Sequence, residues 1–513
     1  MERRANKLIP YDLVTVPGLD ELEASLVTVG EIPSRAEAIG IGVYSDGELP
    51  DGIGYDRANL ETAGFSAAEG SSLMLPGIDT ADRVLLGLGE RSAASDRVLR
   101  DAGAALARAA ARRSRLALRI DDLAGVDSVA AVRALSEGAL LARYRYTVLM
   151  GSSKHVPLEE LVLDVPGGAE AGAAVSAARV SARVAVVARD LANTPPGHLT
   201  AVNMGEIAVE LGERFGFEVE TFDKQQLIDL GCGGLLGVNQ GSVEDPRMIV
   251  LRYRPEGDSS GTLGLIGKGI MYDSGGISLK PSDPMHLLMK MDMGGAAAVL
   301  GAFTGLRDAG VNAEVIGWLM CTDNMPSGTA YKLGDVLTAR DGTTIEVKNT
   351  DAEGRLVMSD AFAFAKEEGV DAIVDIATLT GAALVSLGGH VAALLGNDDG
   401  VIDAVRDASA STDEQVWQLP LVRKYRKQLD SDIADISNLG GPFAGTITAA
   451  LFLDHFAGST PWAHLDIAGT MQVDADDSWR TKGATGFGAR LLLDFAKSFT
   501  PAGRAASNRI ESA

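Results

Sequence analysis

Apolar runs alternate with an alanine-rich helical segment along the first third of the chain. Runs of about four to eight apolar residues bounded by turn formers are typical of buried strands, and residues 98–113 have the composition of a helix. This alternation predicts a smaller N-terminal α/β domain, which we place at residues 1–168. Its expected strands are residues 12–16, 83–88, 116–120, 146–150 and 161–165.

The segment that follows residue 168 is rich in Ala, Val and Arg, which favours a helix. Asn193 and the two prolines Pro195 and Pro196 interrupt the pattern, because proline cannot continue a helix. We therefore expect a connecting helix at residues 169–195.

The remaining residues, 196–513, repeat the alternation on a larger scale and predict a C-terminal α/β domain with a central mixed sheet covered by helices. The apolar stretch 379–396 is broken by Ser386 and by glycines, so a strand, a turn and a second buried segment are expected there rather than a membrane helix. The expected strands are 263–266, 315–320, 344–347, 372–378, 391–395 and 464–467, and the expected helices are 295–306, 356–368, 447–456 and 487–498.

Charge and composition narrow the possible functions. The formal net charge of −24 argues against nucleic-acid binding by the whole surface, because that binding needs basic side chains. We interpret the arginines between residues 100 and 119 as a solvated helix face. Cys232 and Cys321 cannot form a disulfide framework, and we find no secretory signal, so we expect a cytoplasmic protein without a membrane segment.

Two segments set glycines and charged residues among apolar neighbours, at residues 266–295 and 349–356. Four carboxylates lie there without a histidine, and such an oxygen ligand set could hold two divalent ions. If residues 351–355 are extended, alternate side chains share a face, and two carboxylates and a guanidinium line one wall. Taken singly, each residue is better explained by a surface ion pair or a glycine turn than by a metal site. The carboxylates are Asp273, Asp292, Asp351 and Glu353, and the nearby cations are Lys268, Lys280 and Arg355.

In combination, these segments resemble the leucine aminopeptidase family, also called the cytosol aminopeptidases. The similarity rests on GKGIMYDSGGISLKP at residues 267–281 and on NTDAEGRL at residues 349–356. It covers about residues 193–498. Further similar motifs lie at residues 323–328, 375–381, 431–435, 447–450, 464–469 and 482–486.

The resemblance implies two metal sites that share Asp273 and Glu353 as bridging ligands. Asp351 completes one site, and Asp292 with the amine of Lys268 completes the other. Mn²⁺ is the first expectation for both ions, and Zn²⁺ is the alternative.

Catalytic and substrate-binding roles also follow from the resemblance. Lys280 would polarise the scissile carbonyl, and Arg355 would hold a bicarbonate ion that acts as general base. The implied substrate contacts are Thr378, Leu379 and Gly381, with Met289, Met293 and Ala468 as additional pocket residues.

One segment departs from the family pattern, because residues 281–291 are one residue longer between Lys280 and Asp292. Asp283 thereby becomes a rival metal ligand. We favour Asp292, since MDMGGAA at residues 291–297 matches the family and Asp283 precedes Pro284 in an expected turn.

The resemblance implies a homohexameric aminopeptidase that removes Leu and other bulky apolar residues from the N-termini of peptides. A water that bridges two metal ions would attack the first peptide bond. A DNA-binding regulatory side function is the alternative, and only a local basic patch could serve it. A metal-binding protein without catalysis is a third hypothesis, which would not require Lys280 and Arg355.

Overall fold

The computed structural model describes residues 15–167 and 171–501 and separates into two compact units. Among the described residues, one unit contains residues 16–186 and 473–483, and the other contains residue 15, residues 187–472 and residues 484–501. The boundary predicted between residues 168 and 169, and most of the strand predicted at 12–16, lie outside the described residues. Helix α5 (Ala171–Asn193) passes from the first unit into the second.

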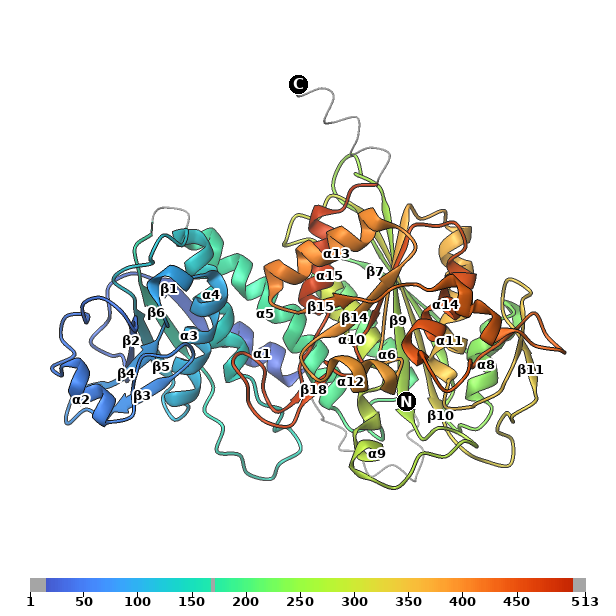
Figure 1. Cartoon of the computed structure of the whole chain (residues 1–513), viewed down its shortest axis with the longest axis horizontal. Coiled ribbons are helices and arrows are strands. Elements are labelled where there is room, and N and C mark those ends of the chain that lie inside the picture. Colours follow the sequence, from blue (N-terminus) through green and yellow to red (C-terminus); the bar gives the residue numbers. More distant parts are fainter. Residues whose placement is uncertain (1–14, 168–170, 502–513) are drawn as a thin grey trace. The chain divides into compact units, whose positions relative to one another are not determined.

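The larger unit is built on an eight-stranded mixed sheet (Figure 1). Its centre is parallel, because β9 pairs in parallel with both β10 and β13, and antiparallel strands follow towards both edges. This arrangement confirms the predicted α/β fold with a central mixed sheet. The strand order is β15 (Val416–Gln418), β14 (Ala392–Gly396), β17 (Trp462–Asp466), β13 (Ala372–Ala377), β9 (Thr262–Asp273), β10 (Glu314–Asn324), β8 (Arg247–Tyr253) and β7 (Glu218–Phe222).

Helices pack on both faces of this sheet, with α10 and α15 on one side and α11 and α14 on the other (Figure 1). Every residue of α10 is buried. Gly295 lets this helix approach the sheet, because a Cβ atom there would lie 2.0 Å from the carbonyl oxygen of Ile376. The helices of this unit are α6 (Ala201–Phe215), α7 (Lys224–Asp229), α8 (Gly233–Asn239), α9 (Pro284–Leu288), η2 (Met289–Met291), α10 (Gly294–Phe303), α11 (Glu353–Glu367), α12 (Gly381–Leu387), α13 (Asp399–Thr412), η3 (Arg423–Leu429), α14 (Gly445–Ala457) and α15 (Ala489–Ser498).

Two predictions for this unit were wrong. The segment 379–396 does not begin with a strand, because α12 forms first and only β14 is a strand. Thr380 caps that helix with its hydroxyl, a signal that the apolar run obscured. The strand at residues 344–347 joins a separate sheet and not the central one. That three-stranded sheet consists of β11 (Val336–Thr338), β12 (Thr344–Glu346) and β16 (Ile436–Ser437).

The smaller unit contains a six-stranded, mainly parallel sheet. The predicted strand at residues 146–150 is absent, since those residues form coil and a turn. Strand β2, in contrast, was not predicted, because its sequence AIGIGV contains two glycines. The elements are α1 (Pro17–Ala24), α2 (Arg57–Thr62), η1 (Arg91–Ala93), α3 (Asp96–Ala109), α4 (Ser128–Arg143), and strands in the order β1 (Leu26–Val29), β6 (Glu160–Asp164), β5 (Arg115–Arg119), β2 (Ala38–Val43), β4 (Asp82–Gly87) and β3 (Ser72–Leu75).

The basic run of the smaller unit is not simply a solvated face, which corrects our interpretation. Arg100 is buried and its Nε lies 3.0 Å from a carboxylate oxygen of Glu137. The guanidinium of Arg108 donates to the carbonyl oxygen of Ser478. These arginines are therefore internal structural groups of the unit.

The chain leaves the larger unit at residue 473 and returns at residue 484. This excursion, residues 473–483, belongs to the smaller unit, and its Trp479 is fully buried in the core of that unit. The excursion is flanked by the two-residue strands β18 (Gln472–Val473) and β19 (Gly483–Ala484).

None of the helices that the structure describes between residues 15 and 501 has both the length and the apolarity that a bilayer crossing requires.

Candidate active site

Strand β9 carries two charged side chains into the interior of the larger unit. Lys268 lies in the middle of the strand and Asp273 at its end, and both are buried. A charge in such surroundings needs a partner, because the apolar interior solvates it poorly. The Nζ atom of Lys268 lies 2.8 Å from Asp292 and 2.9 Å from Glu353, and it donates to the carbonyl oxygen of Thr378.

Helix α11 begins at Glu353, which corrects the extended conformation that we predicted for residues 351–355. Asp351 precedes the helix, whereas Glu353 and Arg355 lie in its first turn. The three side chains therefore do not alternate along one wall. Placing Glu353 at the helix N-terminus is electrostatically favourable, because unpaired N–H groups there carry partial positive charge.

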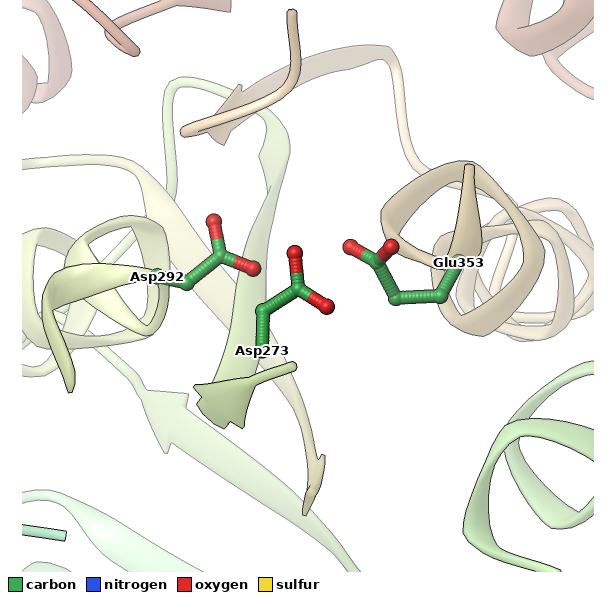
Figure 2. Close-up of side chains that lie close together, drawn as sticks. All are labelled: Asp273, Asp292 and Glu353. Atoms are coloured by element: carbon green, nitrogen blue, oxygen red, sulfur yellow. The ribbon is translucent and has the colours of Figure 1, made fainter. Parts of the chain in front are cut away.

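Three carboxylates converge between these elements, as Figure 2 shows. One oxygen each of Asp273, Asp292 and Glu353 lies within 4.8 Å of the others. The fourth predicted carboxylate, Asp351, is joined to them by Lys280. The Nζ atom of Lys280 lies 2.8 Å from Asp273 and 2.6 Å from Asp351.

Burial and mutual repulsion shift the titration of these carboxylates. Burial raises the pKa of Asp292 well above its ordinary value. Burial and the carboxylates of Glu353 and Asp273 raise the pKa of Asp351 to about 7. For Glu353 burial acts in the same direction, but Lys268 and Lys280 outweigh it and hold its pKa below the ordinary value. The cluster thus holds more negative charge than its surroundings solvate easily.

Burial acts on the buried cations in the opposite direction, since it favours their neutral form and lowers their pKa. Burial disfavours the charged form of Lys268, yet the carboxylates of Asp292 and Glu353 outweigh it and raise its pKa. Arg355 is also buried, and burial lowers its pKa to about 10. Its Nη1 donates to the carbonyl oxygen of Asn438, 2.9 Å away.

A divalent cation fits this donor set. Carboxylate oxygens are the ligands that hard cations prefer, and an ion would neutralise the repulsion from Asp273 and Glu353 that adds to burial in raising the pKa of Asp292. Within the described residues, the cluster contains no histidine or cysteine, so its chemistry is that of an oxygen-rich site.

The carboxylates open into a cavity of about 330 Å³. Thr378, Leu379 and Gly381 line this cavity, as do Met289 and Ala468, whereas Met293 is not among the lining residues. One part of the lining is therefore charged. The apolar part consists of Pro281, Met285, Leu288, Met289, Met291, Leu379, Leu384, Ala468 and Met471.

The rival residue Asp283 also lines the cavity, but its carboxylate caps α9 by accepting the N–H of His286. It is Asp292 that lies with Asp273 and Glu353 in the carboxylate cluster.

Sequence reasoning missed two buried polar residues that hold the site together. Asp466 accepts hydrogen bonds from the N–H groups of Leu379 and Thr380, and so fixes the loop after β13. Asn324 donates to a carboxylate oxygen of Asp273. The available signal was the same in both cases, since each residue lies in one of the similar motifs, at residues 323–328 and 464–469, and at the end of a buried strand.

Comparison with known proteins agrees with this geometry. Residues 186–493 match the model of the cytosol aminopeptidase family catalytic domain, and residues 54–153 match that of the family's N-terminal domain. A probable cytosol aminopeptidase of Chlorobaculum tepidum is 45% identical over 71% of this chain and 75% of its own length. A probable cytosol aminopeptidase of Alkaliphilus metalliredigens is 39% identical over 94% of this chain and 98% of its own length.

The fold of a solved structure agrees as well. The bottromycin maturation enzyme BotP, in complex with Mn, superposes with a TM-score of 0.83 and 37% sequence identity, covering 90% of this chain and 99% of BotP. Since the matched catalytic region contains the whole carboxylate cluster and its cavity, the chain belongs to the cytosol aminopeptidase family and is an aminopeptidase.

Proposed function

We propose that this aminopeptidase uses two divalent cations to remove Leu and other bulky apolar residues from the N-termini of peptides. The observation that carries the proposal is the carboxylate cluster, which opens into a partly apolar cavity. Mn²⁺ is the preferred ion, with Zn²⁺ as the alternative, and BotP in complex with Mn supports that order.

The chain offers ligands for two cations around shared carboxylates. Asp273 and Glu353 would bridge both ions, Asp351 would complete one site, and Asp292 with the Lys268 amine would complete the other. When bound, such ions supply Lewis acidity at the scissile carbonyl and lower the pKa of the attacking water. A lysine can be a ligand only as a neutral amine, so Lys268 must lose its proton when the cation binds.

Two side chains supply further chemistry. Lys280 reaches the cluster from the loop after β9 and would donate a hydrogen bond to the carbonyl oxygen of the substrate as negative charge develops there. Arg355 would hold a bicarbonate ion that accepts the proton of the attacking water. Its buried guanidinium has an Nε without a hydrogen-bond partner, which suits an anion.

The loop after β13 would bind the substrate backbone. Thr378, Leu379 and Gly381 line the cavity, and Asp466 holds this loop from behind. The apolar part of the cavity excludes water from a large aliphatic side chain, which favours Leu over Gly or Asp at the N-terminal position.

The proposal extends to domain roles, location and assembly. Residues 1–168 would form a domain for oligomerisation or regulation. Residues 169–195 would form the helix that connects it to the catalytic domain, residues 196–513. We place the protein in the cytoplasm as a homohexamer. Family resemblance supports the assembly, and the buried free thiols of Cys232 and Cys321 suit a reducing compartment.

Hydrolysis of leucyl p-nitroanilide tests the proposal. Activity should vanish after chelation and return with Mn²⁺ or Zn²⁺, and Glu353→Gln should lower kcat/KM by about 10²–10³-fold or more, since it removes a charged ligand. Leucyl substrates should be cleaved at least about tenfold faster than glycyl substrates.

Glu367→Gln is the matched control, because Glu367 lies at the other end of α11, where it is half exposed and pairs with Arg340. It should retain wild-type activity. Full activity of the thoroughly chelated protein would overturn the two-cation proposal.

A further inference from the structure

Asn324 is the last residue of β10 and lies beside Asp273 because of an irregularity in the strand pairing. Thr322 pairs with Ile270, but two residues later Asn324 pairs with Asp273, so β9 contributes one extra residue. Such bulges re-aim a side chain locally. Here the bulge brings the Asn324 amide to the end of β9, where the carboxylate cluster begins.

The amide nitrogen of Asn324 contacts three oxygen atoms from three segments. Nδ2 lies 2.9 Å from Oδ1 of Asp273, 2.9 Å from the carbonyl oxygen of Thr350, and 3.4 Å from Oε2 of Glu353. The two short contacts account for both N–H groups, and Glu353 lies beside the same donor. The side chain is completely buried.

The two oxygens of each carboxylate, Asp273 and Glu353, have different partners. Oδ1 of Asp273 and Oε2 of Glu353 lie near Asn324, whereas Oδ2 of Asp273 contacts Lys280 and Oε1 of Glu353 contacts Lys268. Each carboxylate therefore presents one oxygen to a neutral donor and the other to a cation.

We propose that Asn324 is a positioning residue that holds Asp273 and Glu353 in the orientation in which they bind divalent cations. It acts through these two carboxylates and does not itself bind an ion. This inference rests on the proposed function, because it assumes that the cluster binds cations.

The surroundings of Asn324 select an amide at this position. Its Oδ1 has no hydrogen-bond partner and faces Gly276, where an added Cβ atom would lie 2.8 Å away. An aspartate would have a similar shape but no N–H groups, and it would place another negative charge beside Asp273 and Glu353. The neutral donor stabilises both carboxylates without occupying a cation's place.

Hydrogen bonds from neighbouring segments hold Asn324 and its partner Thr350 in position. Its backbone carbonyl oxygen accepts the N–H and the hydroxyl of Ser274, so the residues that follow β9 and the end of β10 are tied together. The hydroxyl of Tyr331 donates to the carbonyl oxygen of Thr350, which fixes a third side of the amide's environment.

Mn²⁺ binding to the metal-stripped full chain, measured from the electron paramagnetic resonance signal of free Mn²⁺, tests the inference. Asn324→Ala should raise the apparent Kd about 10- to 100-fold, as is usual when a residue that supports metal ligands is removed. Asn324→Asp should also raise it, although an added negative charge alone would attract the cation more strongly.

Asn239→Ala is the matched control. Asn239 is equally buried, and its amide donates to Thr322 on the same strand and to the carbonyl oxygen of Glu244, but none of its hydrogen bonds joins the carboxylate cluster. The apparent Kd of the Asn239→Ala variant for Mn²⁺ should stay within about twofold of the wild-type value. Circular dichroism verifies that each variant is folded, and Asn324→Asp, which keeps the volume of the side chain, serves if Asn324→Ala does not fold.

The outcomes separate this inference from the proposed function. If the wild-type chain binds neither Mn²⁺ nor Zn²⁺, the proposed function fails; if it binds only Zn²⁺, the variants are compared with that ion. If the wild type binds and a folded Asn324→Ala variant binds equally well, or Asn324→Asp binds more tightly, only the positioning role is overturned.

Discussion

At the scale of single residues, the two lysines and the carboxylates of the active site balance one another. Lys268 contacts Asp292 and Glu353, and Lys280 contacts Asp273 and Asp351. Removing one charged side chain from such a buried set leaves its partner without a compensating charge, and this lowers stability more than removing one member of an exposed ion pair does. The protonation state of each carboxylate therefore decides how easily a cation enters.

Asp351 makes cation binding depend on pH in a defined direction. Its pKa of about 7 in the ion-free fold lies above its unfolded value, so protons compete with the cation below neutrality. Mn²⁺ affinity should fall by up to about tenfold between pH 7 and pH 6. The stability that this group contributes to the ion-free fold is fully present below about pH 4 and is lost as pH rises through 7.

Binding isotherms at pH 6, 7 and 8 measure this effect. Asp351→Asn should bind more weakly but with a flatter pH dependence, whereas Asp399→Asn, at an exposed position on α13, should reproduce the wild-type curve. An unchanged slope in Asp351→Asn would assign the proton competition to another group.

At the scale of elements, the sequence predicts most strands and helices but not where the active-site segments change conformation. The strands around residues 315–320 and 372–378 are strongly apolar, and the structure contains both. Helix α11, in contrast, starts three residues earlier than predicted. Ala352 precedes it without a capping side chain, so the usual start signal is missing and Glu353 looked like part of an extended segment.

The residues of the candidate site could be named from the sequence, whereas their partners could not. Charged residues among glycines stand out, and the family motifs identify them. Asn324 and Asp466 lie within the similar motifs at residues 323–328 and 464–469, but their contacts could not be inferred from them, because these contacts depend on strand pairing and on a loop more than 80 residues away along the chain. Only the folded sheet brings Asn324 to Asp273.

Gly354 on α11 leaves space for the side chain of Lys268 on β9. A Cβ atom at this position of α11 would lie 2.6 Å from Cε and 2.8 Å from Nζ of Lys268. Gly354→Ala would favour the helix by about 1 kcal/mol but push the Lys268 amine away from Asp292 and Glu353. We expect kcat/KM for leucyl p-nitroanilide to fall about tenfold or more, because the displaced amine no longer contacts both carboxylates.

Gly400→Ala provides the comparison, since a Cβ atom on this glycine of α13 would contact only the capping side chain of Asp398, at 3.2 Å, and no residue of the carboxylate cluster. Its activity should equal that of the wild type. Full activity of Gly354→Ala would show that the position of Lys268 tolerates the added methyl group.

At the scale of the whole molecule, the smaller unit is built from two stretches of chain that are far apart in sequence. Trp479 fills its core, and the backbone around Ser478 accepts hydrogen bonds from Arg108 on α3. Trp479→Ala should destabilise this unit by about 3–5 kcal/mol, because it leaves a large cavity.

Hydrogen exchange resolved by peptide measures that loss locally. Protection should fall in β2, β4, β5 and β6, while the strands β9 and β13 of the larger unit keep theirs. Trp417→Ala, at a position with 64% exposure on β15, should leave both patterns unchanged. Equal loss of protection in both units would mean that they unfold as one.

The excursion of residues 473–483 also has a consequence for synthesis on the ribosome. Residues 16–186 emerge first, but the core that contains Trp479 cannot close until almost the entire larger unit has been translated. At about 5–20 residues per second, that delay is roughly 15–60 s. During this interval the nascent N-terminal sheet lacks a tryptophan-sized part of its core and depends on its own helices α3 and α4, or on chaperones, to shield it.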